Sequence, residues 1–269
     1  MQNYRDAITT ATQLYQAGDY SQAELICCRI LDYLPEQPEA LFLLGRISYQ
    51  LVKKRNSPTT PGLDYHLWYY NHEIWNTTTW AGVKALKAPS DMWNYQEIIW
   101  ELKPSLIIEF GSFYGGGTLF FASLLDQLNY PSKVLSVDID HTSLHEKVKN
   151  HPRIHLMRSS STDPAVAQTI VALRREFPGR VFAILDSNHE KQHVLAEMQL
   201  LRPLLQTGDY LVVEDSNING HPVLPGWGEG PYEAMEEYFS HYPQDYQKDK
   251  LREQKFGFTF ASDGFLIRR

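Results

Sequence analysis

The segment at residues 106–118, LIIEFGSFYGGGT, constrains the fold more than any other part of the chain. Its apolar run includes the acid Glu109, and glycines follow at 111, 115, 116 and 117 before an apolar segment begins at residue 119. A strand, a glycine turn and a helix in this order bring an α/β backbone close to a nucleoside-bearing ligand. The spacing is not G-x-G-x-x-G, so it does not indicate a dinucleotide site. An acid two residues before the first glycine suits a ligand with a positive amino-acid end, such as S-adenosylmethionine (SAM).

The composition is that of an acidic globular protein. Hydrophobic residues make up 43% of the 269 residues, enough for a sizeable core. The net charge of −7 argues against a general nucleic-acid or anionic-membrane binder, because attraction to phosphate needs clustered Lys and Arg. No apolar run approaches the ~20 residues of a membrane-spanning helix, and residues 1–10 lack the apolar core of a signal peptide. The adjacent Cys27 and Cys28 are poorly placed to pair, so we expect a cytoplasmic protein.

Residues 1–55 are predicted to form a separate helical segment. Gly18 marks a turn between two helices, Pro35 ends the second, and a third begins at Pro38. The pattern resembles the 34-residue tetratricopeptide repeat, with one repeat over about 4–37 and half of a second; a generic helical hairpin is the alternative. Such a short array does not form a free-standing solenoid. We therefore expect residues 4–50 to pack on the rest of the chain or to contact another subunit or protein.

A polar, proline-bearing linker is predicted at residues 53–61, and an aromatic-rich stretch with Trp68, Trp75 and Trp80 follows it. Aromatic density on this scale is typical of a packed flap or a subunit interface, and a substrate pocket is the second interpretation. The sequence thus predicts two domains, residues 1–55 and residues 56–269, and favours a homo-oligomer.

From residue 91 onward, helical and strand patterns alternate along the chain. Strands are predicted at 106–110, 133–138, 153–157, 181–185 and 210–214, and helices near 92–102, 117–128, 141–149, 164–176 and 189–205. The tail, Phe256–Phe260 and then Phe265–Ile267 around Ser-Asp-Gly, predicts a hairpin with one antiparallel strand at the edge. The predicted fold is α/β: a Rossmann-like class I methyltransferase sheet preceded by short helices.

Polar residues follow the second and third predicted strands. Asp138 ends the second strand, where a carboxylate can accept both ribose hydroxyls, whereas Asp140 is predicted to cap a helix. After the third strand, Ser160, Ser161 and Asp163 are candidates for the adenine edge of a nucleoside. Asp163 precedes a proline and is equally well explained as a helix N-cap.

Three carboxylates are predicted to meet at one patch of the sheet edge. Asp186 ends the fourth strand, and Glu214 and Asp215 end the fifth. Clustered carboxylates repel one another, and a hard divalent cation such as Mg2+ relieves this repulsion; caps and ion pairs are the alternative. His189, three residues after Asp186, is placed to take a proton from a substrate hydroxyl.

These residues resemble the cephalosporin hydroxylase/rhamnosyl O-methyltransferase family of SAM-dependent O-methyltransferases. The resemblance covers about 72–269 and includes EFGSFYGGGT, SVDID, SSSTDP, ILDSNH, FTFASDGFLIRR and the long VEDSNINGHPVLPGWGEGPYEAMEEYF. It implies His189 as the base. It also implies metal ligands at Asp186, Glu214 and Asp215, and SAM contacts at Glu109, Gly111, Ser112, Gly115, Asp138, Ser160, Ser161 and Asp186. Ser159 stands where the family pattern has glycine, so the adenine contacts are the least secure part of the resemblance.

Together these features predict a Mg2+-dependent SAM O-methyltransferase acting on a hydroxyl of a small polar metabolite, a sugar or natural product. The loop at 217–231 is a candidate lid and substrate wall, with an interface loop as the alternative. One rival hypothesis is a methyltransferase-fold scaffold that recruits partners through residues 4–50. Another is a metal-free methyltransferase in which the three acids are caps and ion pairs.

Overall fold

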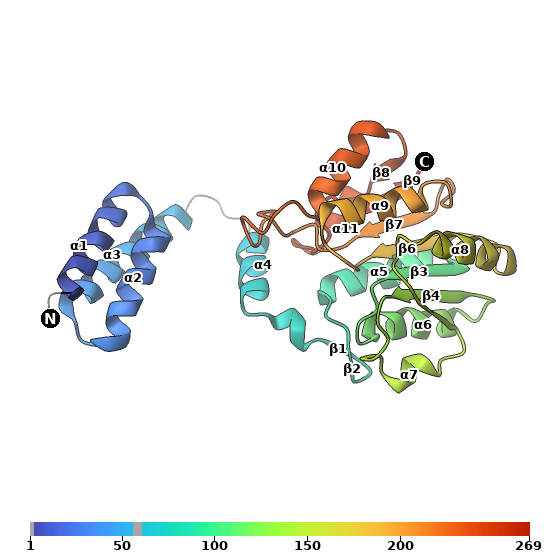
Figure 1. The fold of residues 1–269 in the computed structure, drawn as a ribbon, viewed down its shortest axis with the longest axis horizontal. Helices are drawn as coiled ribbons and strands as arrows, with labels where there is room; N and C mark the ends of the chain where they lie inside the picture. Colours follow the sequence, from blue (N-terminus) through green and yellow to red (C-terminus); the bar gives the residue numbers. More distant parts are fainter. Residues whose placement is uncertain (1–2, 56–60) are drawn as a thin grey trace. The chain divides into compact units, whose positions relative to one another are not determined.

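The computed structural model describes residues 3–55 and 61–269 (Figure 1). The chain forms two compact units, the first ending before Pro61 and the second beginning there. The first unit contains α1 (Asn3–Ala17), α2 (Tyr20–Tyr33) and α3 (Pro38–Arg55). The three helices expected here are confirmed, and the tetratricopeptide assignment stays a prediction. Of the predicted linker, residues 53–55 belong to α3, Pro61 begins α4, and residues 56–60 lie outside the described part of the chain.

Small side chains allow the helices of the first unit to pack closely. Ala11 and Ala23 are fully buried in a small core to which α3 contributes Leu43 and Ile47. Gly18 takes a positive φ of 84° in the turn between α1 and α2, a conformation that favours glycine. Cys27 is buried in the same core, and both cysteines are free.

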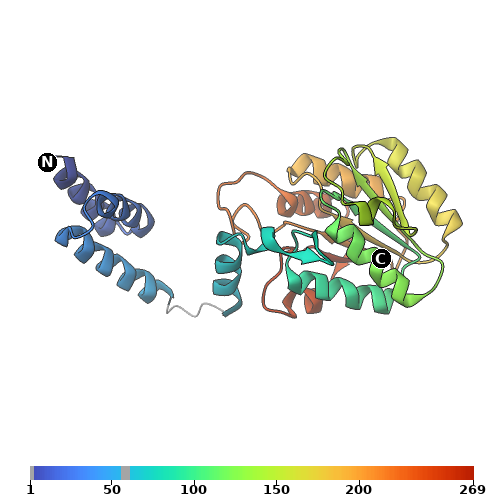
Figure 2. The ribbon, with the colours of Figure 1, turned by 90° about the horizontal axis from the view of Figure 1, so that it is seen from below.

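The second unit is built on a seven-stranded sheet (Figures 1 and 2). In sheet order its strands are β5 (Ile154–Arg158), β4 (Lys133–Asp138), β3 (Leu106–Phe110), β6 (Val181–Leu185), β7 (Tyr210–Val213), β9 (Phe265–Arg268) and β8 (Tyr246–Lys248). The first five are parallel, and β9 runs antiparallel to both of its neighbours. The carboxyl ends of β3, β4, β6 and β7 therefore lie along one edge.

Helices cover both faces of this sheet. On one face α5 (Pro89–Leu102) and α6 (Gly116–Leu128) pack Tyr95 and Phe121 against Phe182 of β6. On the other face lie α8 (Pro164–Glu176), α9 (Lys191–Leu201) and α10 (Pro231–His241). Both faces of the central strands are buried, which explains their nearly continuous apolar runs.

The remaining short elements lie between the main ones. They are α4 (Pro61–Asn71), the 3-10 helix η1 (Ile74–Thr77), the hairpin strands β1 (Thr79–Trp80) and β2 (Val83–Lys84), α7 (Glu146–Lys149) and α11 (Lys250–Gln254). Within the described ranges, no helix combines the length and apolar character needed to span a membrane.

The prediction for the tail was partly wrong. The antiparallel strand at 265–268 is confirmed, but its hairpin partner is not Phe256–Phe260; β9 lies between β7 and β8. The segment at 256–260 is irregular because its aromatic side chains pack on α4, where Tyr69 meets Phe258 and Phe260. Its backbone is held by Asp91, which accepts the Phe260 N–H at 2.8 Å.

The prediction of a long helix at 141–149 was also wrong. Only Glu146–Lys149 is helical, and His145 rather than Asp140 caps it. Asp140 instead accepts hydrogen bonds from the N–H and hydroxyl of Thr142 and stabilises a turn. Smaller differences concern β5, which begins one residue later than predicted, and β7, which ends one residue earlier.

Candidate active site

A cavity of about 500 Å³ lies at the carboxyl ends of the parallel strands. Most of the predicted site residues line it: Glu109, Gly111, Ser112, Asp138, Ser161, Asp186, His189 and Asp215. Gly115, Ser160 and Glu214 are not among the lining residues. The sheet topology accounts for this gathering, because each lining acid lies within two residues of the carboxyl end of a parallel strand.

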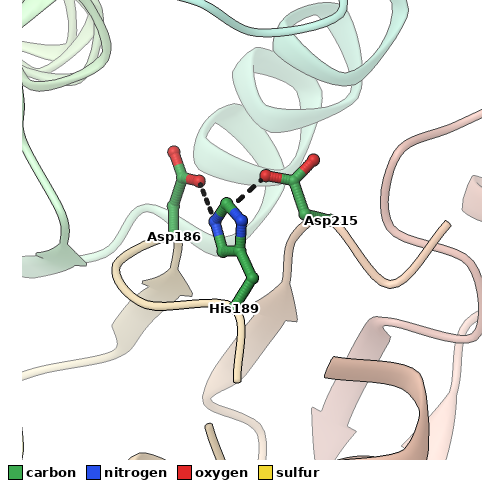
Figure 3. A group of neighbouring side chains, drawn as sticks. All are labelled: Asp186, His189 and Asp215. Atoms are coloured by element: carbon green, nitrogen blue, oxygen red, sulfur yellow. Dashed lines mark ion pairs between the residues drawn. The ribbon is translucent and has the colours of Figure 1, made fainter. Parts of the chain in front are cut away.

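Asp186, His189 and Asp215 form a tight cluster (Figure 3). His189 Nε2 lies 3.2 Å from Asp215 Oδ2 and 3.6 Å from Asp186 Oδ1. Nε2 is buried, yet neither contact has hydrogen-bond geometry, and it has no other hydrogen-bond partner among the described residues. One ligand atom from each residue falls within 4.8 Å of the others, a spacing compatible with a shared cation.

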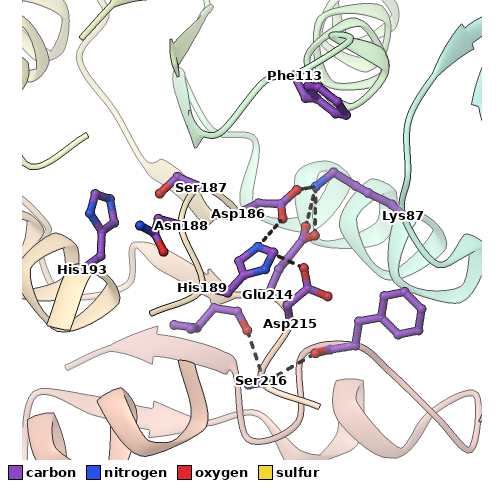
Figure 4. Close-up of polar contacts among 12 residues, drawn as sticks. Lys87, Phe113, Asp186, Ser187, Asn188, His189, His193, Glu214, Asp215 and Ser216 are labelled. Atoms are coloured by element: carbon purple, nitrogen blue, oxygen red, sulfur yellow. Dashed lines mark hydrogen bonds and ion pairs between the residues drawn. The ribbon is translucent and has the colours of Figure 1, made fainter. Parts of the chain in front are cut away.

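Lys87 engages the other side of this acid cluster (Figure 4). Its ammonium donates to Asp186 Oδ2 at 2.6 Å and to both Glu214 oxygens at 2.8 and 2.9 Å. Lys87 is only 2% exposed and Glu214 only 6%. Glu214 therefore faces the lysine, whereas the other oxygen of Asp186 faces His189.

The mutual interactions of these groups shift their pKa values. Burial raises the pKa of Glu214 and of Asp215. Burial also acts to raise the pKa of Asp186, but Lys87 and His189 together outweigh it and lower that pKa. Burial lowers the pKa of His189, but the carboxylates of Asp215 and Asp186 outweigh it and raise the pKa to about 9. Without a bound cation, the imidazole is thus held in its charged form at neutral pH.

Glu109 is buried and interacts with the charge of Lys87. It accepts a hydrogen bond from the Thr118 hydroxyl, and burial raises its pKa to about 7 against the opposing effect of Lys87. A Cβ atom at Gly117 would lie 2.4 Å from Glu109 Oε1, so this glycine leaves room for the carboxylate. Glu109 lines the cavity and can meet a positive group there.

Asp138 organises the glycine loop. Its Oδ2 accepts the backbone N–H groups of Ser112 at 2.8 Å and Phe113 at 2.9 Å, while Oδ1 accepts that of Asp140. The carboxylate also lines the cavity, so it combines a structural role with a position suited to ribose. Gly115 precedes α6, and its α-carbon faces the side chain of Val148 rather than the cavity.

In the serine loop after β5, some residues stabilise the local structure and others line the cavity. Asp163 caps α8 by accepting the Ala165 N–H at 2.8 Å, which confirms the N-cap interpretation. Ser160 bonds to Thr162, whereas Ser161 lines the cavity and contacts His193 Nε2 at 2.9 Å.

Aromatic side chains form part of the cavity wall. Tyr70 and Trp75 come from the aromatic stretch, Phe113 from the glycine loop, and Trp227 and Phe260 from later loops. The aromatic stretch therefore contributes to both a packed flap and the cavity.

The predicted lid loop is also part of this wall. Ile218 and Trp227 line the cavity, and Asn217 is buried 2.9 Å from His66 Nε2 of α4. The loop at 217–231 is thus placed to contact a substrate; its movement as a lid stays a prediction.

Sequence reasoning missed Lys87 and His193. Lys87 occupies a segment with no clear period, and its partners Asp186 and Glu214 are 99 and 127 residues away. His193 lies one helical turn before Glu197, and this i, i+4 spacing was the available signal.

The sheet and its cavity define a class I methyltransferase fold: five parallel strands, an antiparallel strand inserted next to the edge, and acids at the strand ends. The profile of the rhamnosyl O-methyltransferase/CmcI family matches residues 72–269. The chain therefore belongs to that family, and the expectation of an O-methyltransferase is confirmed.

Individual relatives agree with this assignment. The chain is 60% identical over 206 residues to the rhamnosyl O-methyltransferase of Mycobacterium leprae (strain TN), covering 77% of this chain and 90% of that protein. It is 58% identical over 205 residues to the protein of the same name from Mycobacterium tuberculosis (strain ATCC 25618 / H37Rv), covering 76% and 84%. A solved structure of CmcI with Mg and SAM shares the fold at a TM-score of 0.57 and 21% identity, over 72% of this chain and 77% of that one.

Proposed function

We propose that this chain transfers a methyl group from SAM to a hydroxyl of a sugar or sugar-bearing natural product, with Mg2+ as a second cofactor. The observation that carries the proposal is one cavity that joins Glu109 and Asp138 to the cluster of Asp186, His189 and Asp215. The names of the mycobacterial relatives favour a rhamnosyl group as the acceptor.

The cofactor would lie along the carboxyl ends of β3 and β4. Glu109 is placed to meet the ammonium group of SAM, and Asp138 its ribose hydroxyls. Ser161, oriented by His193, is the candidate contact for the adenine edge. Ser160 bonds to Thr162 and is the weaker of the two serine candidates.

The chain's own residues fit a Mg2+ ion. Asp186 and Asp215 offer the oxygen atoms that this ion prefers, and the buried, unpartnered Nε2 of His189 faces the same space. Glu214 stays a proposed third ligand, although both of its oxygens accept hydrogen bonds from Lys87. When bound, the cation would supply positive charge that offsets the carboxylates and lowers the pKa of an acceptor hydroxyl.

His189 is the proposed general base. Neutralising Asp186 and Asp215 removes the cause of its raised pKa, so that a neutral imidazole becomes available near pH 7. Nε2 would take the hydroxyl proton while the acceptor oxygen forms a bond to the methyl carbon. The carbon–sulfur bond of SAM breaks in the same displacement, and S-adenosylhomocysteine leaves. Positioning contributes most, because the sulfonium is already reactive.

The test is transfer of tritiated methyl from SAM to a panel of hydroxyl compounds that includes p-nitrophenyl α-L-rhamnoside. We expect Asp186→Ala to abolish transfer while SAM still binds, and His189→Gln to lower turnover by about 10²–10⁴-fold, the usual contribution of a general base. Trp93→Ala, on an exposed side chain of α5, is the control. Full activity of Asp186→Ala would overturn the proposed role of this acid.

For the first unit we propose contacts with a second subunit or another protein. Phe42 is 69% exposed and borders a groove that Tyr15 and Leu41 also line. Exposed aromatic side chains beside a groove favour a contact surface. A homo-oligomer with a cytoplasmic location completes the proposal, and size-exclusion chromatography with light scattering tests the oligomer.

A further inference from the structure

Lys87 lies between the candidate cofactor site and the acid cluster. Its ammonium contacts Asp186 and Glu214, and its charge also acts on Glu109. Both Glu214 oxygens and the Oδ2 atom of Asp186 accept hydrogen bonds from this one group. In Figure 4 the lysine enters from the opposite side of the acids to His189.

The local backbone fixes Lys87 in this position. A Cβ atom at Gly117 would lie 2.8 Å from Lys87 Cε, and one at Gly116 would lie 2.2 Å from the Lys84 carbonyl oxygen. The segment at 84–87 therefore passes directly over the start of α6, and Pro89 begins α5 immediately afterwards. The contact is built into the fold and is unlike a surface lysine that samples many rotamers.

Charge balance gives this lysine a specific task. Glu109, Asp186, Glu214 and Asp215 bring four carboxyl groups close enough to Lys87 to interact with its charge. A buried carboxylate without a partner is costly, and a lysine or a divalent cation can each relieve that cost. Lys87 already offsets the charge of Glu214 and binds Asp186 Oδ2. Asp186 Oδ1 and Asp215 are left facing His189.

We propose that Lys87 is a positioning residue and a built-in counter-ion, which holds Glu214 and Asp186 and competes with Mg2+ for their charge. The lysine thereby keeps Glu214 and Asp186 in place when no cation is bound, and it limits the affinity of the acid cluster for Mg2+. This inference rests on the Mg2+ part of the proposed function. It predicts that removal of the ammonium makes the protein more dependent on the cation and makes cation binding tighter.

The test compares the full chain with Lys87→Met, Lys87→Gln and Lys87→Arg at one pH, by calorimetric titration with MgCl2 and by thermal unfolding in Mg2+ and in EDTA. For Lys87→Met and Lys87→Gln we expect a lower Tm in EDTA, a larger rise in Tm on adding Mg2+, and a Mg2+ Kd lower by about tenfold. Lys87→Arg keeps the charge and is expected to stay near the wild-type Mg2+ Kd.

A second variant separates charge from folding. In EDTA, Lys87→Met combined with Glu214→Gln is expected to recover part of the Tm lost in Lys87→Met, because the unpaired carboxylate has gone. Equal loss of Tm with and without Mg2+, or weaker Mg2+ binding by both Lys87→Met and Lys87→Gln, would overturn the counter-ion role. Absence of Mg2+ binding by the wild-type chain would instead overturn the metal part of the proposed function.

Discussion

Gly116 lies against the backbone of Lys84, and a Cβ atom at this glycine would come 2.2 Å from the Lys84 carbonyl oxygen. A Cβ atom at Gly111 would likewise come 1.9 Å from the Asp186 carbonyl oxygen, and Gly111 has a positive φ of 91°. The glycines of the 111–117 loop therefore allow chain segments to cross one another, in addition to any approach to a ligand. The 111–117 loop therefore has a packing role in addition to its proposed role in binding a ligand.

A methyl group at Gly116 should consequently destabilise the protein. We expect Gly116→Ala to lower the free energy of unfolding by about 1–3 kcal/mol, the usual cost of overpacking, and to weaken SAM binding by displacing the segment that carries Lys87. Urea unfolding measures the first effect. Gly45→Ala is the control, because that glycine lies within α3 with nothing within 4 Å of a new Cβ; it should be neutral or stabilising. Unchanged stability of Gly116→Ala would contradict the packing argument.

The central sheet was predictable because its strands carry nearly continuous apolar runs, which the glycine loop and the strand-end acids separate from the helices. The tail was not predictable in the same way. Phe256–Phe260 has the composition of a strand, but its rings pack on α4 and its backbone is bound by Asp91, 169 residues earlier than Phe260. Only the tertiary structure decides between these two uses of the same side chains.

Asp91 gives a prediction about pH. The residue is buried, accepts hydrogen bonds from the Thr259 hydroxyl and the Phe260 N–H, and burial raises its pKa to about 7. The unfolded side chain loses its proton near pH ~3.9. Between these values the folded state binds more protons than the unfolded state, so this group makes stability fall as pH rises from about 4 to about 7.

Asp91→Asn should remove that contribution. Between pH 5 and pH 7, roughly the window set by these two pKa values, we expect the free energy of unfolding from urea titrations to fall less in the variant than in the wild type. The difference in slope should be at most about 1.4 kcal/mol per pH unit. Parallel pH profiles for the two proteins would show that the folded carboxyl group does not retain its proton in this range.

Trp227 tests the substrate wall. It lines the cavity from the 217–231 loop and is 44% exposed, so it is available to an acceptor. We expect Trp227→Ala to raise the KM for the acceptor by about tenfold, in line with the ~1 kcal/mol or more of a stacking contact, and to leave the SAM Kd unchanged. An equal loss of affinity for SAM and acceptor would assign the tryptophan to the general structure of the loop.

Deletion of residues 1–55 tests the first unit. Every described residue that lines the cavity lies at or beyond Tyr70, and the two core clusters of the sheet contain no residue of α1–α3. SAM binding and turnover should therefore be retained within about twofold, whereas partner capture or oligomer size should change. Unchanged oligomer size and unchanged pull-down partners would remove the proposed contact role of residues 4–50.

The position of each acid at the end of its strand was predictable from the sequence. The ion pairs that these acids form with Lys87 were not. Asp186 and Asp215 were expected at one edge, and they lie there. The sequence contains no sign that Lys87 would bind Glu214, because a buried lysine reveals itself only through its distant partners. Asp138 was expected to face a ribose, and its additional bonds to the loop N–H groups depend on the turn geometry.

Binding of SAM to this cavity is tested most directly by calorimetric titration of the wild-type chain with SAM, first with Mg2+ and then with EDTA. The contacts proposed at Glu109, Asp138 and Ser161 do not require the cation, so we predict micromolar binding of SAM under both conditions. Absence of binding with Mg2+ and with EDTA would contradict the assignment of this cavity to SAM.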